Sequence, residues 1–255
     1  MNYWIRSAWR KQLYQLTERN IIYQLSHDLD KQYYLAILQV YNDSQIKNHS
    51  PYEDVREYIE EVIRSFAKYA PQDKYLVFKH HPMDRGYVSY QAQINRLITL
   101  LGLEGRVFYG YELPLPTLYP LLKGVITINS TVGLSALLHH VPTFCMGRAL
   151  YDLPGLTTRG SLEGFWHKQD PVCKKTFERM RQSLLHLTQL NASFYRHLDM
   201  GAMAVVEKIQ QHNVQALSAQ KSQRAATPSG VVGALAILSA FCLLTEEMLT
   251  PVTMI

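Results

Sequence analysis

Short apolar runs alternate with longer segments of helical periodicity along the first 150 residues. The short runs are rich in β-branched and aromatic residues and are bounded by polar or turn residues, which is typical of buried strands. They predict strands at 33–41, 74–79, 106–109, 124–128 and 141–146. Because helical segments separate most of these strands, we predict parallel strands with crossover helices. This is the doubly wound, Rossmann-like α/β class.

The helical segments carry apolar residues three and four positions apart. They predict helices at 3–26, 51–69, 89–101, 134–140 and 172–213, and a loop with a short helix at 112–122. For the second helix, Ser50 is the expected N-cap, with Pro51 at the first helical position and Glu53 in the capping-box position. Gly102 is the expected end of the third helix.

The chain changes character near residue 215. We predict one Rossmann-like domain over 31–214, within which 151–170 is irregular. Small polar residues from about 215 resemble a linker and lead to a mostly apolar run, 231–244. That run is shorter than the roughly 20 residues that span a bilayer. A packed helix and an interfacial segment both fit it, so 215–255 is a tail of unknown role.

Composition narrows the classes of function. Hydrophobic residues make up 47% of the chain and charged residues 18%, enough for a sizeable core. The net charge of +5 suits an anionic substrate or a membrane surface, and a solvated surface explains it equally well. No long basic run is present, which disfavours nucleic-acid binding.

The cysteines and the first 20 residues bear on the compartment. Cys145, Cys173 and Cys242 form no CxxC pair, so we expect neither a zinc site nor a disulfide framework. This agrees with a reducing, cytoplasmic compartment. Residues 1–20 have no continuous apolar core, so no signal peptide is expected. We also expect no cofactor.

The sequence LVFKHHPMDRG places cationic and titratable groups directly after the second predicted strand. Lys79, His80 and His81 lie in this loop, and Pro82 restricts the backbone of His81. An imidazole fixed at a strand end can donate a hydrogen bond to a phosphate oxygen and, if protonated, stabilise charge on a leaving group. A surface loop with solvated histidines is the alternative.

A second candidate site follows the fourth strand. Asn129, Ser130 and Thr131 open a helix, where backbone N–H groups and hydroxyls favour an anion. The alternative is an ordinary N-cap. In a parallel sheet this loop and the histidine loop share the carboxyl edge, where ligands bind.

Two further loops carry polar groups. Gln39, Asp43 and Gln45 follow the first strand and either hold a sugar or form an Asx-type turn. Arg148 follows the fifth strand and either meets a carboxylate or phosphate or forms part of a structural loop.

These motifs also resemble a known family. The segments LQVYNDSQIKNHSPY, LVFKHHPMDRG, RVFYG and INSTVGLSALLHHVPTFCMGRALYDLPGLT occur in the order found in the capsule polysaccharide biosynthesis/export family of Gram-negative bacteria. The branch of capsule modification and lipid-linker proteins is the more similar. The resemblance implies a GT-B glycosyltransferase that transfers Kdo, a sugar acid, from CMP-Kdo to a lipid-linked capsule acceptor. It also implies that the protein is cytoplasmic, associates peripherally with the inner membrane and belongs to a capsule assembly complex.

The resemblance assigns roles to individual residues. His81-Pro82 matches the family's HP pair, whose histidine contacts the donor phosphate and supports departure of CMP. Ser130 and Thr131 match the motif that cradles the same phosphate. The catalytic carboxylate of the family's first domain has no counterpart here, so residues 1–30 are expected to be the inter-domain helix and a remnant of that domain. Two alternatives therefore stay open: a non-catalytic capsule export component and an inactive truncated remnant.

Overall fold

The computed structural model describes residues 3–190 and 199–211. The chain divides into two compact units, Met1–Met180 and Arg181–Ile255, and the division falls within one helix. The first unit contains residues 1–30, the sheet and every predicted site residue. The expected linker and tail lie outside the described residues.

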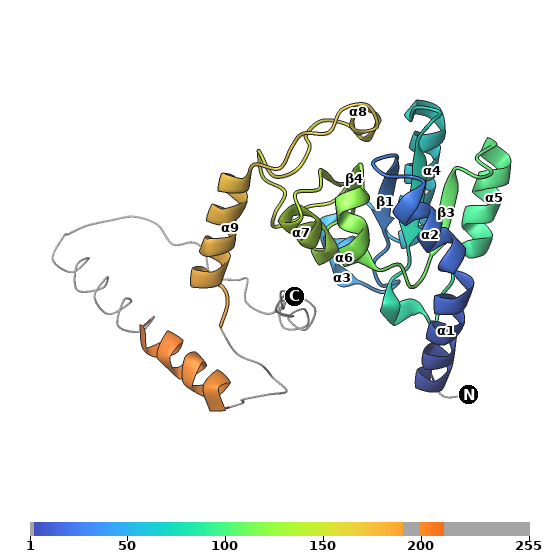
Figure 1. The fold of residues 1–255 in the computed structure, drawn as a ribbon. Helices are drawn as coiled ribbons and strands as arrows, with labels where there is room; N and C mark the ends of the chain where they lie inside the picture. The colour runs from blue at the N-terminus through green and yellow to red at the C-terminus, as the bar shows by residue number, and fades with distance from the viewer. Residues whose placement is uncertain (1–2, 191–198, 212–255) are drawn as a thin grey trace. The chain divides into compact units, whose positions relative to one another are not determined.

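A five-stranded parallel sheet forms the centre of the first unit (Figure 1). Its order is β3-β2-β1-β4-β5, in which the strand order reverses beside β1. The strands are β1 Tyr33–Ile37, β2 Tyr75–Lys79, β3 Val107–Gly110, β4 Gly124–Thr127 and β5 Thr143–Cys145. The predicted Rossmann-like α/β fold is therefore confirmed. Polar loops that follow neighbouring strands share one edge of this sheet.

Helices cover the sheet and surround its carboxyl edge. The α-helices are α1 Tyr3–Thr17, α2 Arg19–His27, α3 Ser44–His49, α4 Val55–Tyr69, α5 Gln91–Leu101, α6 Leu115–Leu118, α7 Thr131–Leu138, α8 Leu162–Phe165 and α9 Lys174–Leu187. Two 3₁₀ turns span Pro82–Asp84 and Tyr119–Leu121, and residues 199–211 are also helical. No helix among the described residues is long and apolar enough to cross a membrane.

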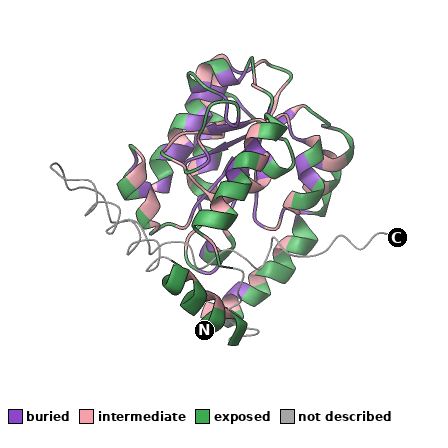
Figure 2. Ribbon diagram, turned by 90° about the vertical axis from the view of Figure 1, so that its left-hand side faces the viewer, coloured by how far each residue is buried: buried purple, intermediate pink, exposed green. Residues whose placement is uncertain are grey.

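Two apolar clusters form the core, and the sheet appears buried between helices in Figure 2. One cluster joins the sheet to the apolar faces of α4 and α5 and includes the fully buried Trp166. The other includes Leu25 of α2, which is also fully buried. Helix α2 therefore contributes to the core.

The predicted start of the second helix is wrong. Residues Ser44–His49 were expected to be loop, but they form α3, because Ile46 is buried and Asp43 caps the helix by accepting a bond from the Gln45 N–H. Ser50 lies just after α3 and donates back to the Ile46 carbonyl oxygen. Helix α4 instead begins at Val55, capped by Asp54.

Other boundaries also differ from the prediction. The segment 3–26 forms two helices, the first strand ends at Ile37, and the helix after β4 begins at Thr131. Within 172–213, α9 ends at Leu187, and residues 191–198 lie outside the described residues. Apolar periodicity identified these elements, but caps and tertiary burial set their ends.

Candidate functional site

Gln39 joins two of the predicted loops at the carboxyl edge of the sheet. Its side-chain amide donates to Asp43 Oδ2 and Asn129 Oδ1, each at 2.9 Å. Its oxygen accepts from the Asn129 N–H at 3.1 Å. Gln39 is 4% exposed, so these bonds form in a nearly dry environment where they fix geometry strongly. The side chain therefore positions the loops after β1 and β4 against each other.

Asp43 and Gln45 complete this connection. Asp43 Oδ1 accepts from the Gln45 N–H at 2.9 Å, while Oδ2 accepts from Gln39. The Gln45 carbonyl oxygen accepts from Asn129 Nδ2 at 3.1 Å. Both carboxylate oxygens of Asp43 thus hold the loop, which gives this residue a positioning role. The structure brings together four residues that are up to 90 positions apart in the chain.

His81 lies at the beginning of the 3₁₀ turn Pro82–Asp84 and is partly exposed. Its Nδ1 accepts from the Met83 N–H at 3.1 Å, so in the neutral ring the proton is on Nε2. Burial and the positive charge of Lys79 lower the pKa of His81 to about 4, although Asp43 acts in the opposite direction. Near neutral pH the free ring is therefore a neutral hydrogen-bond donor.

Ser130 and Thr131 form the start of α7. Ser130 is the N-cap and accepts from the Val132 N–H at 3.2 Å, while Thr131 is the first helical residue. Tyr151 is 4% exposed and donates to the Ser130 carbonyl oxygen. A Cβ on Gly133 would overlap the Tyr151 ring, so glycine permits this close packing. Nothing in the sequence pattern around Tyr151 indicated this supporting contact.

Lys79 and His80 do not share the surface position of His81. Lys79 is 8% exposed and donates to the carbonyl oxygens of His80 and Tyr111 at 3.0 and 2.6 Å. His80 is 1% exposed, and its Nδ1 lies 2.6 Å from the Tyr109 hydroxyl. Both side chains support the loop from inside the domain.

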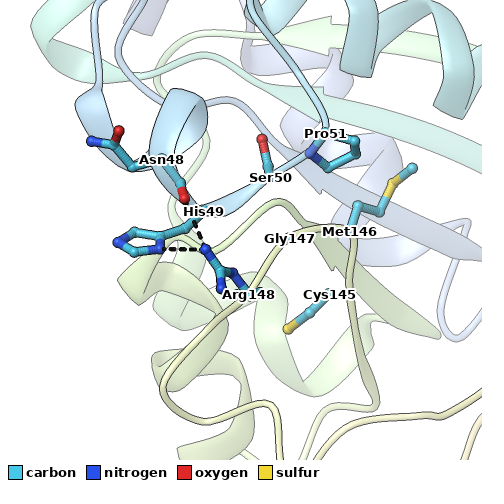
Figure 3. Close-up of a pocket in the computed structure, with 8 residues that line it drawn as sticks. All are labelled: Asn48, His49, Ser50, Pro51, Cys145, Met146, Gly147 and Arg148. Atoms are coloured by element: carbon cyan, nitrogen blue, oxygen red, sulfur yellow. Dashed lines mark hydrogen bonds between the residues drawn. The ribbon is translucent and has the colours of Figure 1, made fainter.

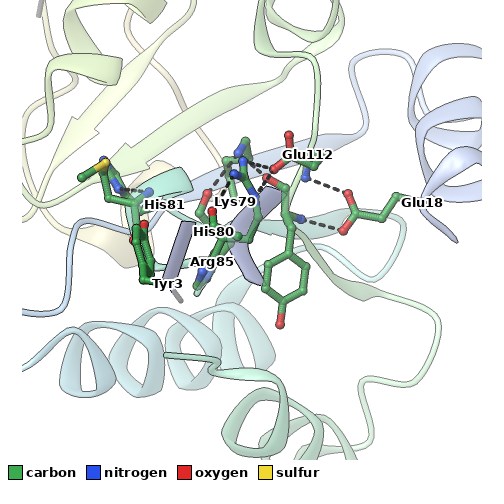
Figure 4. Close-up of polar contacts among 10 residues, drawn as sticks. Tyr3, Glu18, Lys79, His80, His81, Arg85 and Glu112 are labelled. Atoms are coloured by element: carbon green, nitrogen blue, oxygen red, sulfur yellow. Dashed lines mark hydrogen bonds and ion pairs between the residues drawn. The ribbon is translucent and has the colours of Figure 1, made fainter. Parts of the chain in front are cut away.

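The N-terminal helices hold the histidine loop from the other side (Figure 4). Glu18 accepts from the N–H groups of Tyr111 and Glu112 at 2.7 and 2.8 Å. The guanidinium of Arg85 pairs with Glu112, and both side chains are largely buried. Residues 1–30 thus support the candidate site, a role that their helical periodicity did not indicate.

Arg148 lies in a separate cavity of about 360 Å³ at the same edge (Figure 3). The guanidinium donates to the Asn48 carbonyl oxygen at 3.0 Å and lies 3.4 Å from His49 Nδ1. Residues 48–51 and 145–148 line the cavity. Gly147 allows the two segments to approach, since a Cβ there would lie 2.8 Å from the His49 oxygen. His49 was not predicted as a site residue, because its only signal was its position in the loop after the first strand.

The part of the chain that the structure describes contains two cysteines and no cluster of metal ligands. No group of three His, Cys, Asp or Glu side chains is arranged to hold a metal ion there. Cys145 and Cys173 are free thiols, and burial raises the pKa of Cys145 to about 12. The site offers hydrogen bonds and a helix terminus, which suit recognition of an anion.

Comparison with known proteins finds relatives that are all capsule polysaccharide proteins. The model of the family described as "Capsule polysaccharide biosynthesis protein" matches residues 1–195. The capsule polysaccharide export protein KpsS of Escherichia coli is 52% identical over 192 residues, which cover 75% of this chain and 49% of KpsS. The capsule polysaccharide modification protein LipB of Neisseria meningitidis serogroup A is 38% identical over 193 residues, covering 75% of this chain and 46% of LipB. The chain spans about half the length of these curated relatives.

Solved structures show weaker likeness. The β-Kdo 2,7 transferase KpsC of Thermosulfurimonas dismutans has a TM-score of 0.38 and 22% identity, over 64% of this chain and 56% of that chain. The UDP-GlcNAc 2-epimerase of Methanocaldococcus jannaschii has a TM-score of 0.31 and 17% identity, over 69% and 53%.

Proposed function

The chain belongs to the capsule polysaccharide biosynthesis family, and on this premise we propose that it forms the donor-binding part of a glycosyltransferase. The donor is CMP-Kdo, and the acceptor is the lipid-linked end of the capsule polysaccharide. The sequence motifs that resemble the Kdo-transferring branch support this choice. So does the observation that carries the proposal: the loop after β1 is bonded to the start of α7 through Gln39 and to the histidine loop through the Tyr41 N–H, which donates to Asp84 Oδ2 at 2.9 Å.

In this proposal His81 and the start of α7 share the phosphate of the donor. Departure of CMP leaves negative charge on the phosphate, and preorganised donors stabilise such charge. The Nε2–H of His81 supplies one donor. The first N–H groups of α7 and the hydroxyls of Ser130 and Thr131 supply others, aided by the helix dipole. Bound phosphate would also raise the pKa of His81 from its low value, because it places an anion beside the ring.

Other residues of the edge then have distinct roles. Gln39, Asp43 and Asn129 hold the loop after β1 against the start of α7. Arg148 and the cavity beside it lie next to the C-terminal end of α3, and we assign them to another part of the donor. Lys79 and His80 act on the site only through the shape of the histidine loop.

A purified-protein binding experiment tests the proposed donor. We expect CMP to bind more tightly than UDP or GDP in calorimetric titrations at neutral pH, with inorganic phosphate as the weakest competitor. Equal dissociation constants for the three nucleotides, or no binding of CMP, would contradict the proposed donor site.

His81→Ala should weaken CMP binding by one to two decades. The variant loses one hydrogen bond to a charged phosphate, which contributes about 1.5–3 kcal/mol. His167→Ala is the matched control, since His167 is exposed and belongs to the loop after α8. The same titrations measure both variants. If both bind CMP like the unmodified chain, His81 does not contact the phosphate.

A second candidate function follows from the name of the Escherichia coli relative, a capsule polysaccharide export protein. An export protein would bind the polysaccharide without transferring a sugar. Calorimetric titration of the chain with CMP and with the polysaccharide separates the two functions, because only the donor-binding part of a transferase is expected to bind the nucleotide.

A further inference from the structure

Three tyrosine rings gather beside the histidine loop. The rings of Tyr3 and Tyr87 stack with their centroids 4.2 Å apart, and the Tyr41 ring lies 6.2 Å from that of Tyr87, at an angle of 44°. They come from the start of α1, the loop after β1 and the segment before α5. Tyr41 and Tyr87 are 45% and 58% exposed, and Tyr3 is partly exposed. We call these three residues the tyrosine platform.

The backbone of the histidine loop fixes the position of the platform. The Tyr3 hydroxyl donates to the Met83 carbonyl oxygen at 2.8 Å, and the Met83 N–H donates to His81 Nδ1 at 3.1 Å. Tyr3 and His81 therefore bond to the backbone of the same residue (Figure 4). A Cβ on Gly86 would overlap the Tyr3 ring, so glycine lets this ring lie against the loop. The platform is thus continuous with the candidate phosphate site.

A positive charge lies beside the platform. Arg10 donates to the Arg85 carbonyl oxygen at 2.8 Å, in the loop that carries the platform. Two carboxylates of this region are already engaged. Glu112 pairs with the guanidinium of Arg85, while Asp84 is fully buried and accepts from the Tyr41 N–H at 2.9 Å. Helix α1 itself contains no carboxylate, so the surroundings of the platform favour an anionic group.

This combination suits a sugar ring that carries a carboxylate. A pyranose has C–H groups on its faces and hydroxyls at its rim, and a tyrosine has an apolar ring face and a polar tip that stays wet. Stacking of the two buries apolar surface and leaves the hydroxyls free to form hydrogen bonds. A purely apolar partner would bury the tyrosine hydroxyls without partners, which is costly. A guanidinium matches the shape and charge of the carboxylate.

We propose that the tyrosine platform binds a sugar-acid ring, with Tyr41 and Tyr87 against its face and Arg10 at its carboxylate. The ring belongs to the donor or to the end of the acceptor, since the two share this chemistry. The link through Met83 places the ring beside the phosphate assigned to His81. The inference rests on the proposed function for the identity of the sugar, which is Kdo.

Tyr41→Ala tests the platform, because the substitution removes the ring and keeps the backbone N–H that donates to Asp84. CMP, CMP-Kdo and a soluble Kdo trisaccharide are titrated calorimetrically into the unmodified chain and the variant. If the ring belongs to the donor, the variant should bind CMP-Kdo about fivefold more weakly and CMP equally well. If it belongs to the acceptor, only the trisaccharide should lose affinity, again about fivefold.

Three further variants make this result specific. Tyr41→Phe keeps the ring and should retain the affinity of the unmodified chain. Arg10→Gln removes the positive charge and should weaken the same ligand as Tyr41→Ala. Tyr23→Ala removes a tyrosine of α2 that is 61% exposed, and this control should bind all three ligands normally.

Two results would overturn the proposal. One is a Tyr41→Ala variant that binds all three ligands like the unmodified chain. The other is a variant that loses only its binding to phosphatidylglycerol vesicles, which would assign the platform to a lipid surface. Failure of the proposed function has a different signature. A chain that binds neither CMP nor CMP-Kdo contradicts the donor site, whereas trisaccharide binding that Tyr41→Ala weakens would still support the platform. If none of the three ligands binds, both proposals are wrong.

Discussion

Glu18→Ala is expected to lower the free energy of unfolding by about 3–5 kcal/mol. The carboxylate is 7% exposed and accepts two backbone N–H bonds, from Tyr111 and Glu112. A hydrogen bond to a charged group contributes about 1.5–3 kcal/mol, and removal of the acceptor leaves the two donors without it. Burial, the largest cause, raises the pKa of Glu18, while the two N–H bonds and the positive charge of Lys79 act in the opposite direction. Urea unfolding at neutral pH measures the change.

Two further variants make this result specific. Glu104→Ala removes an exposed carboxylate and should change stability by less than about 0.5 kcal/mol. Glu18→Gln keeps an acceptor oxygen and should lie between the unmodified chain and Glu18→Ala. If Glu18→Ala lowers the free energy of unfolding by less than about 1 kcal/mol, the N-terminal helices do not stabilise the domain through Glu18, and the histidine loop keeps its position without this contact.

Acid is expected to destabilise the domain through His80. Burial, the larger cause, and the charge of Lys79 lower the pKa of His80 from 6.5 to about 3. The unfolded chain therefore binds the proton more tightly than the folded chain. Stability is complete above pH 6.5 and is lost as the pH falls toward 3, by about 1.4 kcal/mol per pH unit. Between pH 6.5 and 4.5 this amounts to about 3 kcal/mol.

His80→Gln isolates this effect from other groups. Burial raises the pKa of Asp84 to about 6, so protonation of Asp84 favours the folded chain over part of the same range and opposes His80. Because Asp84 is present in both proteins, the difference between His80→Gln and the unmodified chain should reflect His80 alone. Relative to the unmodified chain, the variant should gain about 3 kcal/mol when urea unfolding is repeated at pH 4.5 instead of 7. His167→Gln, an exposed control, should follow the unmodified chain. A constant difference between His80→Gln and the unmodified chain at the two pH values would show that His80 is protonated inside the folded domain.

The candidate site was predictable in part because two of its components are local. A buried strand followed by His81-Pro82, and another followed by Ser130 and Thr131, are patterns within a few residues. The parallel order of elements then places both at the carboxyl edge of one sheet. The bond of Gln39 to Asn129 is different, because a donor and acceptor 90 residues apart leave no mark on local periodicity.

The sequence by itself determined the α/β class, the five strands and the helix faces, since these follow from short-range alternation of apolar and polar side chains. Only the tertiary structure decided which groups of the histidine loop face solvent. Lys79 and His80 point inward because they form hydrogen bonds there, Lys79 to carbonyl oxygens and His80 to the Tyr109 hydroxyl. His81 stays partly exposed. The tertiary structure also decided that α1 points its polar side inward, because its partners on the histidine loop and after β3 lie more than 70 residues away along the chain.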